Sequence, residues 1–171
     1  MLANIPNLTT TPTLSLIYRA SRDGVYTSDF HRQCDLKGRT VTFVRSSKGF
    51  ACAGYTKISW SNSTSTYVTD PDARLFALTG KKTVYKPGKP EYAVWHYYNS
   101  GPSFSGAMGL WSSPLTSTNG AVCMTNNRDW GEYNVKTDAQ GNSLLTGDGA
   151  GQPDGSKWFT ASEIEVYQVI Q

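Results

Sequence analysis

The sequence from Thr40 to Tyr55, TVTFVRSSKGFACAGY, predicts a β-hairpin. Both of its halves are rich in residues that favour strands, and residues 46–49 between them are polar and end in glycine. A short link of this kind lets two neighbouring strands pair in antiparallel fashion. Four residues of the hairpin are expected in or near a core: Val41, Phe43, Cys52 and Tyr55.

Further strands are predicted on both sides of this hairpin. Residues 163–169 place Ile164 and Val166 on one face of a strand, and they place Glu163 and Glu165 on the other. Many short strands indicate a mainly β domain, and we expect a two-sheet antiparallel β-sandwich with short flanking helices. Shorter runs predict the remaining strands at 14–18, 73–78, 82–86, 92–97, 108–111 and 121–124.

One short helix is expected before the hairpin. The Thr27 hydroxyl is suited to cap its start, and Asp29 lies in the first turn, where the helix dipole favours an anion. Phe30 and Cys34 fall four residues apart and therefore share one face. We expect Lys37-Gly38 to end the helix.

The domain organisation follows from where the polar stretches lie. Residues 1–13 are polar and interrupted by prolines, so we expect an arm outside the core, followed by a single domain at 14–171. Residues 60–66 are almost entirely Ser, Thr and Asn and predict a loop. Residues 138–157 are rich in Gly, Asp, Asn and Gln and predict a long mobile loop.

Composition excludes several partners. The 171 residues carry a net charge of +3 with scattered basic residues, so we expect no nucleic-acid partner. We also expect the chain to be monomeric by itself. No run of 18 apolar residues is present, which predicts no membrane span. Cys34, Cys52 and Cys123 cannot all pair with one another, which favours a reducing compartment, the cytoplasm. The sequons at Asn7 and Asn62 are a weaker, opposite signal.

The search for catalytic and metal-binding groups gives few positions. We interpret His31 as a residue at the surface or rim of the fold and His96 as a hydrogen-bonded sheet residue. Three isolated cysteines and two distant histidines do not have the spacing of a metal site, and we expect no metal or cofactor. Glu163 and Glu165 fit a solvated strand face better than an acid/base pair. Cys34 is the one thiol with cationic neighbours in the sequence.

The order of several motifs resembles that of the TLDc domain family. The matching stretches span most of the chain, from Leu14 to Val169. They are residues 16–24, 29–35, Lys37-Gly38, Gly54-Tyr55, Ser59-Trp60, 70–73, 75–79, 101–104 and 163–169.

The resemblance implies the β-sandwich fold, a role in protection against oxidative stress, and binding to the vacuolar proton-pumping ATPase. It brings no established catalytic residues, so we expect a non-enzymatic protein-interaction module that docks on a large assembly. The alternatives are a structural subunit of a stable ciliary or mitochondrial complex, and a weakly peroxide-reactive or hydrolytic enzyme.

Two sets of residues are expected to take part in such an interaction. Aromatic residues in polar stretches predict an exposed docking patch, with Tyr67 as a further member. The acidic positions typical of the family supply the second set, for which a purely structural role is the alternative. The expected interaction residues are Trp60, Trp130, Trp158, Asp23, Glu163 and Glu165.

Overall fold

The fold consists of antiparallel β-sheets with a few short helices, as expected from the sequence. The computed structural model describes residues 2–6, 11–63, 65–118, 120–125, 130–147 and 156–171. The larger sheet has six strands, each hydrogen-bonded to antiparallel neighbours. Across the sheet their order is β1 (Thr13–Arg19), β12 (Ala161–Ile170), β2 (Thr40–Ser46), β3 (Ala51–Thr56), β5 (Arg74–Ala77) and β6 (Thr83–Tyr85).

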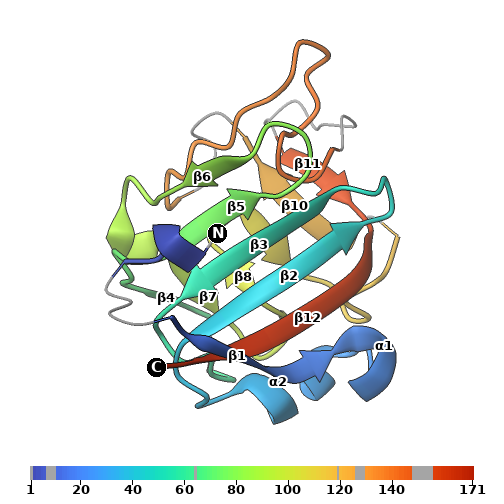
Figure 1. Cartoon of the computed structure of the whole chain (residues 1–171). Helices are drawn as coiled ribbons and strands as arrows, with labels where there is room; N and C mark the ends of the chain where they lie inside the picture. Colours follow the sequence, from blue (N-terminus) through green and yellow to red (C-terminus); the bar gives the residue numbers. More distant parts are fainter. Residues whose placement is uncertain (1, 7–10, 64, 119, 126–129, 148–155) are drawn as a thin grey trace.

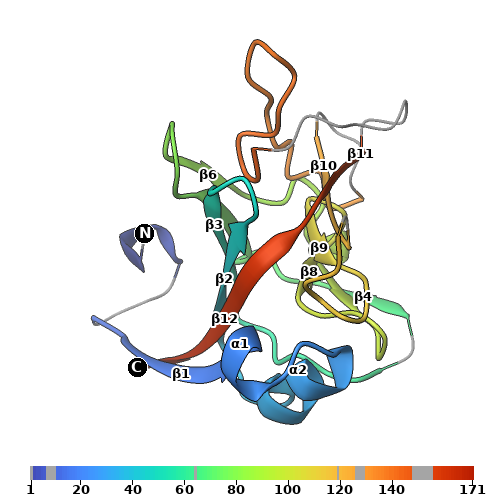
Figure 2. The same ribbon diagram turned by 90° about the vertical axis from the view of Figure 1, so that its right-hand side faces the viewer.

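The second layer contains a four-stranded sheet and a separate pair of strands, and Figure 2 shows it facing the larger sheet. The four-stranded sheet has the order β11 (Ser156–Phe159), β10 (Ala121–Met124), β9 (Met108–Leu110) and β8 (Ser103–Phe104). The pair consists of β4 (Thr66–Val68) and β7 (Val94–His96), which are also antiparallel. The expected β-sandwich is therefore confirmed, with the β4–β7 pair as an addition to its second layer.

Two α-helices lie at one end of the sandwich, α1 (Ala20–Asp23) and α2 (Thr27–Cys34) (Figure 1). The cap of α2 differs from the prediction, because Tyr26 is the N-cap residue and Thr27 is the first helical residue. The backbone N–H of Tyr26 donates to the Asp29 carboxylate at 3.1 Å, so Asp29 does stabilise the first turn. The 3-10 helices are η1 (Leu2–Asn4) and η2 (Pro90–Tyr92).

The main core fills the space between the two layers. Ile164 and Val166 of β12 face into it, as the alternation in the sequence predicts. Gly54 of β3 allows the layers to approach closely, because a Cβ at this position would lie 2.2 Å from the ring of Phe104. The ring of Phe104 therefore takes the place that a side chain on β3 would otherwise occupy.

A second apolar cluster covers the outer face of the larger sheet. Ile5, which follows η1, is 4% exposed and packs with Val41, Tyr55 and Phe76. Figure 1 shows η1 in front of this sheet. The expectation that residues 1–13 lie outside any core is therefore wrong for Ile5. Its apolar side chain packs on the outer face of the larger sheet, because this packing removes it from water.

The predicted loop at 138–157 is only partly confirmed. Residues 148–155 lie outside the described residues, and Lys157 belongs to β11 rather than to a loop. Leu145 is fully buried in the main core, so this stretch contributes to the packing. In the described part of the chain, none of the helices is both long and apolar enough to cross a membrane.

Candidate functional site

Aromatic side chains surround a cavity of about 300 Å³ on the second layer. Strands β4 and β7 contribute Tyr67 and Trp95, and Tyr97 directly follows β7. The other two rings are Trp111, which directly follows β9, and Trp130. Three small residues, Ser100, Ser105 and Gly106, complete the lining. The five aromatic lining residues are Tyr67, Trp95, Tyr97, Trp111 and Trp130.

The rings form a continuous series that begins at Trp130 in the cavity wall and extends past the cavity at Tyr98. We call this series the aromatic row; in order of contact it consists of Trp130, Tyr92, Tyr67, Trp95, Tyr97 and Tyr98. Successive ring centroids lie 6.3, 5.2, 4.5, 6.4 and 4.7 Å apart. The two end members are the most exposed, Trp130 at 65% and Tyr98 at 54%. Exposed tyrosine and tryptophan side chains of this kind are the residues most often found at the centre of protein interfaces.

Strand pairing and one histidine position the middle of the aromatic row. Tyr67 and Trp95 are direct partners in the β4–β7 register. The expectation that His31 lies at the rim is wrong, because its side chain is 8% exposed. Its Nε2 lies 3.0 Å from the carbonyl oxygen of Ser100, and its Nδ1 lies 2.8 Å from the Asp35 carboxylate. His31 thus ties α2 to the segment that follows β7 and carries Tyr97.

Backbone hydrogen bonds hold the segment that carries Trp130. The N–H of Gly131 donates to Ser105 Oγ at 2.9 Å, and the N–H of Lys89 donates to the carbonyl of Gly131 at 3.1 Å. The buried hydroxyl of Tyr133 donates to the carbonyl of Ala93, immediately before β7. The exposed indole of Trp130 is therefore attached to a fixed backbone.

The three predicted tryptophan positions have different environments. Trp60 is 1% exposed, so its prediction as an exposed docking residue is wrong. Its indole N–H donates to Thr40 Oγ1 at 2.9 Å inside the core, and the ring contacts Phe104. Trp158 is half-buried in β11 and packs edge-on against Trp111, with ring centroids 6.5 Å apart. Trp130 alone among the three lines the aromatic cavity.

The predicted acidic residues come together where α1 meets β1 and β12. Asp23 accepts a hydrogen bond from the backbone N–H of Arg19 at 2.8 Å. The guanidinium of Arg19 binds the Glu165 carboxylate at 2.7 Å. Glu163 accepts hydrogen bonds from the backbone N–H and the hydroxyl of Ser21. Asp23 and Glu163 thus fasten α1 to β1 and β12, and Glu165 joins β12 to β1, which is a structural use of all three charges.

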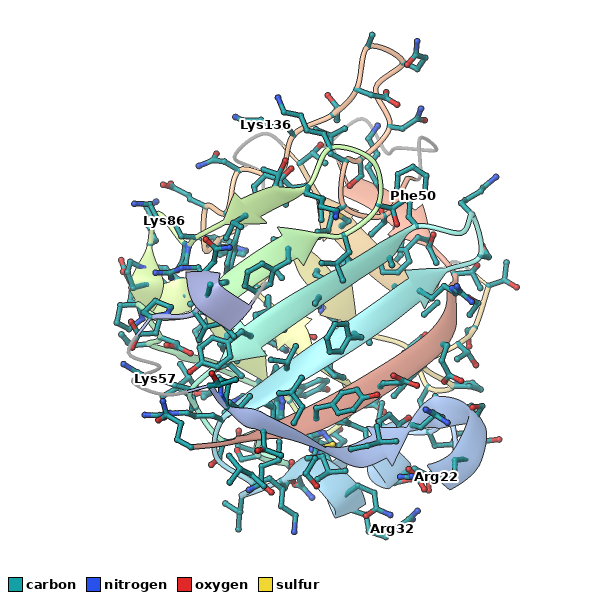
Figure 3. The ribbon with its side chains drawn as sticks, in the orientation of Figure 1. Arg22, Arg32, Phe50, Lys57, Lys86 and Lys136 are labelled. Atoms are coloured by element: carbon teal, nitrogen blue, oxygen red, sulfur yellow. The ribbon has the colours of Figure 1, made fainter. Side chains whose placement is uncertain are left out.

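Asp23 also binds the neighbouring Arg22 through both carboxylate oxygens, at 2.7 and 2.8 Å. The Arg22 guanidinium, with the N–H of Arg19 in addition, holds the pKa of the Asp23 carboxyl below its usual value. Arg22 and Arg32 project from this end of the molecule (Figure 3). The acidic residues belong to α1 and β12, and none of them lines the aromatic cavity.

A model of the TLDc domain matches residues 1–170. The chain belongs to the TLDc domain family. Membership links it to oxidative-stress-related protein interaction. No curated protein matches the chain.

The three thiols of this TLDc chain are buried. Cys34 and Cys123 are 0% exposed and Cys52 is 1% exposed. Burial raises the pKa of the Cys34 thiol and of the Cys52 thiol, and the nearby carboxylate of Asp35 raises that of Cys34 further. A thiol in such surroundings stays protonated at neutral pH and reacts slowly.

The interpretation of His96 as a hydrogen-bonded sheet residue is confirmed in this TLDc chain. It belongs to β7 between Trp95 and Tyr97, and its Nδ1 lies 3.3 Å from the hydroxyl of Ser61. Burial lowers the pKa of its imidazole. Its ring also packs near Trp60, with centroids 5.7 Å apart.

Most of the aromatic row was not predicted from the sequence. Tyr92, Trp95, Tyr97, Tyr98 and the adjoining Trp111 were not expected as interaction residues. A signal was present, because residues 92–98 contain four Tyr and Trp residues among seven. Such a density on a strand that also carries polar residues indicates a surface with aromatic side chains on it.

Proposed function

We propose that this TLDc chain is a non-enzymatic module that docks on a large protein assembly through the aromatic row. The assembly we propose is the vacuolar proton-pumping ATPase, and the cellular role is protection against oxidative stress in the cytoplasm. The observation that carries the proposal is the exposure of Trp130 and Tyr98 at the two ends of a continuous series of rings.

The physical reason is the cost of leaving these rings in water. An aromatic side chain buries a large apolar area when it enters an interface, and it loses little conformational entropy on doing so. The hydrogen bonds of Gly131 and Tyr133 fix the backbone beside Trp130. A fixed anchor loses less freedom on association, so more of its contact energy contributes to affinity.

The chemistry of the other expected residues supports a non-enzymatic role. A peroxide-reactive cysteine needs a lowered pKa and access to solvent, and Cys34 has a raised pKa and a fully buried side chain. An acid/base pair needs carboxylates directed at a substrate, and Glu163 and Glu165 are bound to Ser21 and Arg19.

The choice of assembly rests on the family. The resemblance to TLDc proteins implies binding to the vacuolar proton-pumping ATPase, and the match of the family model over residues 1–170 supports this choice of partner through family membership.

The test is binding of the pure protein to the immobilised, purified vacuolar pump. We expect saturable binding of the unmodified chain, and weakening of at least tenfold by Trp130→Ala, since interface tryptophans are frequent hot spots. Tyr26→Ala is the matched control, because Tyr26 is also more than half exposed, at 54%, but does not line the aromatic cavity.

Failure of the unmodified chain to bind the pump would overturn the proposed partner. Equal weakening by Trp130→Ala and Tyr26→Ala would overturn the proposed surface. Circular dichroism and thermal melting of each variant establish that the fold is intact.

A further inference from the structure

We propose that the aromatic row and its cavity bind a proline-rich segment of the protein partner, held in the polyproline II conformation. This inference rests on the proposed function and deepens it, because it specifies the kind of peptide that the docking surface takes. Three observations carry it: the aromatic wall of the cavity, the neutral character of that wall, and the extension of the row beyond the cavity.

The side chains that line the cavity favour one of the known modes of peptide recognition over the others. Among the described residues that line it, five aromatic rings are joined only by two serines and a glycine, and none is charged or aliphatic. Recognition of an acidic or phosphorylated motif uses arginine clusters, which this lining does not supply. Proline-rich segments, in contrast, dock in grooves lined by aromatic side chains.

The mutual tilt of the rings gives the surface a ridged shape. Tyr67 and Trp95 are inclined at 67° to each other, and Trp95 and Tyr97 at 56°. Neighbouring rings therefore present faces and edges alternately rather than one flat platform. A pyrrolidine ring is compact and apolar, and it packs well against such a surface because it adds no charge that the neutral wall would leave unpaired.

The extent of the row favours an elongated ligand over a small cation. A quaternary ammonium group interacts with rings whose centroids lie within about 6 Å of it, so one enclosed group of rings suffices for it. Here the row includes Tyr92, which lies between Trp130 and Tyr67, and it continues past the cavity from Tyr97 to Tyr98. A polyproline II helix rises about 3.1 Å per residue and can therefore contact several of these rings in turn.

A polar atom of the cavity wall complements the same ligand. A polyproline II segment has no internal hydrogen bonds, so its backbone carbonyls need donors when they leave water. Indole N–H groups are donors, and the indole N–H of Trp111, a residue of the cavity wall, is buried and has no hydrogen-bond partner among the described residues.

Both partners would be ordered before they meet. The polyproline II conformation is already populated in free proline-rich segments, which lowers the entropy lost on binding. In the TLDc chain, His31 holds the carbonyl of Ser100, and Ser105 holds the N–H of Gly131; Ser100 and Ser105 both line the cavity. The site therefore needs little rearrangement to accept its ligand.

The experiment is a titration of the pure chain with acetylated decaproline amide, followed by tryptophan fluorescence and by calorimetry. An uncharged Gly-Ser peptide of the same length is the matched ligand control, and tetramethylammonium and a neutral oligosaccharide are the competing ligand classes. The protein variants are Trp130→Ala and Tyr98→Ala, with Tyr26→Ala as the control of matched exposure.

We expect saturable binding of decaproline, at least tenfold weaker for Trp130→Ala, weaker for Tyr98→Ala, and unchanged for Tyr26→Ala. No saturable binding of decaproline, or equal binding of the Gly-Ser peptide, would overturn the inference. Saturable binding of tetramethylammonium or of the oligosaccharide in place of decaproline would overturn it as well, and would assign the cavity to that ligand class.

The outcome is separable from that of the proposed function. If the pump binds the unmodified chain and decaproline neither binds nor competes, the inference about the peptide fails while docking on the pump stands. If decaproline binds and the pump does not, the aromatic row is a peptide site and the partner has been assigned wrongly.

Discussion

Tyr67 and Trp95 are direct partners across the β4–β7 pair, and their ring centroids lie 4.5 Å apart, the closest contact in the aromatic row. The pairing joins a three-residue strand to another of equal length, and each strand contributes one wall residue to the cavity. Short strands have few hydrogen bonds of their own, so the ring contact contributes to holding them together, by about 0.5–1.5 kcal/mol. The aromatic row therefore stabilises the β4–β7 pair and also forms part of its exposed surface.

Trp60 and Trp130 provide a direct comparison of a core and a surface tryptophan. Trp60→Ala removes a fully buried ring and leaves Thr40 Oγ1 without its donor, so we expect the free energy of unfolding to fall by about 3–5 kcal/mol. Trp130→Ala removes a ring that is 65% exposed, and the expected change is within about 0.5 kcal/mol. Equilibrium unfolding in urea measures both; similar losses for the two variants would contradict the assignment of Trp130 to the surface.

Gly54 is expected to tolerate no side chain. Gly54→Ala places a Cβ 2.2 Å from a carbon of the Phe104 ring, and the overpacking should cost about 1–3 kcal/mol of stability. Phe104→Leu alone should destabilise the protein by loss of packing, but in the Gly54→Ala background it should restore part of the stability. A double-mutant cycle from urea unfolding measures this coupling, and strictly additive losses would show that the two positions do not meet.

The comparison of Ile164 with Trp60 shows what the sequence could predict. The face on which Ile164 lies follows from the two-residue period of β12, which is a local property, and its prediction is confirmed. Trp60 lies among Ser and Asn residues, a local signal for an exposed loop. Its burial depends on Phe30 and Phe104, which are distant in the sequence and meet Trp60 only in the folded core.

The aromatic row was not predicted from the sequence for the same reason, because its members lie far apart in the sequence and meet only in the fold. Its members come from Tyr67, residues 92–98 and Trp130, three segments that the β4–β7 pairing and the hydrogen bond from Tyr133 to the carbonyl of Ala93 bring together. The polar stretch 60–66 predicted a loop, and β4 begins at its last residue. A three-residue strand has too short a pattern to reveal its partner in advance.

The burial of the three cysteines predicts slow thiol chemistry. We expect Cys34, Cys52 and Cys123 to react with Ellman's reagent at negligible rates in the native protein, and all three to react rapidly in guanidinium chloride. Cys34→Ser should leave the rate of peroxide consumption unchanged. Fast labelling of one thiol in the native state, abolished by Cys34→Ser, would revive the peroxide-reactive alternative.

Burial of His96 makes stability depend on pH. The pKa of its imidazole is lower in the folded state than in the unfolded state, where it is about 6.5, so below that pH the unfolded state binds more protons. We expect the free energy of unfolding to fall as pH is lowered from about 7.5 to 5.5. His31 and Asp35 also influence this site, so the difference between the unmodified chain and His96→Gln is the relevant quantity. If His96→Gln shows the same pH dependence as the unmodified chain, protonation of His96 is not the cause.

Hydrogen–deuterium exchange of the chain, alone and bound to the purified vacuolar pump, tests docking through the aromatic row most directly. We expect slower exchange on binding at residues 66–68, 94–100 and 130–133, with little change at α1 and β12. Slower exchange confined to α1 and β12, where the Asp23, Glu163 and Glu165 carboxylates lie, would contradict it.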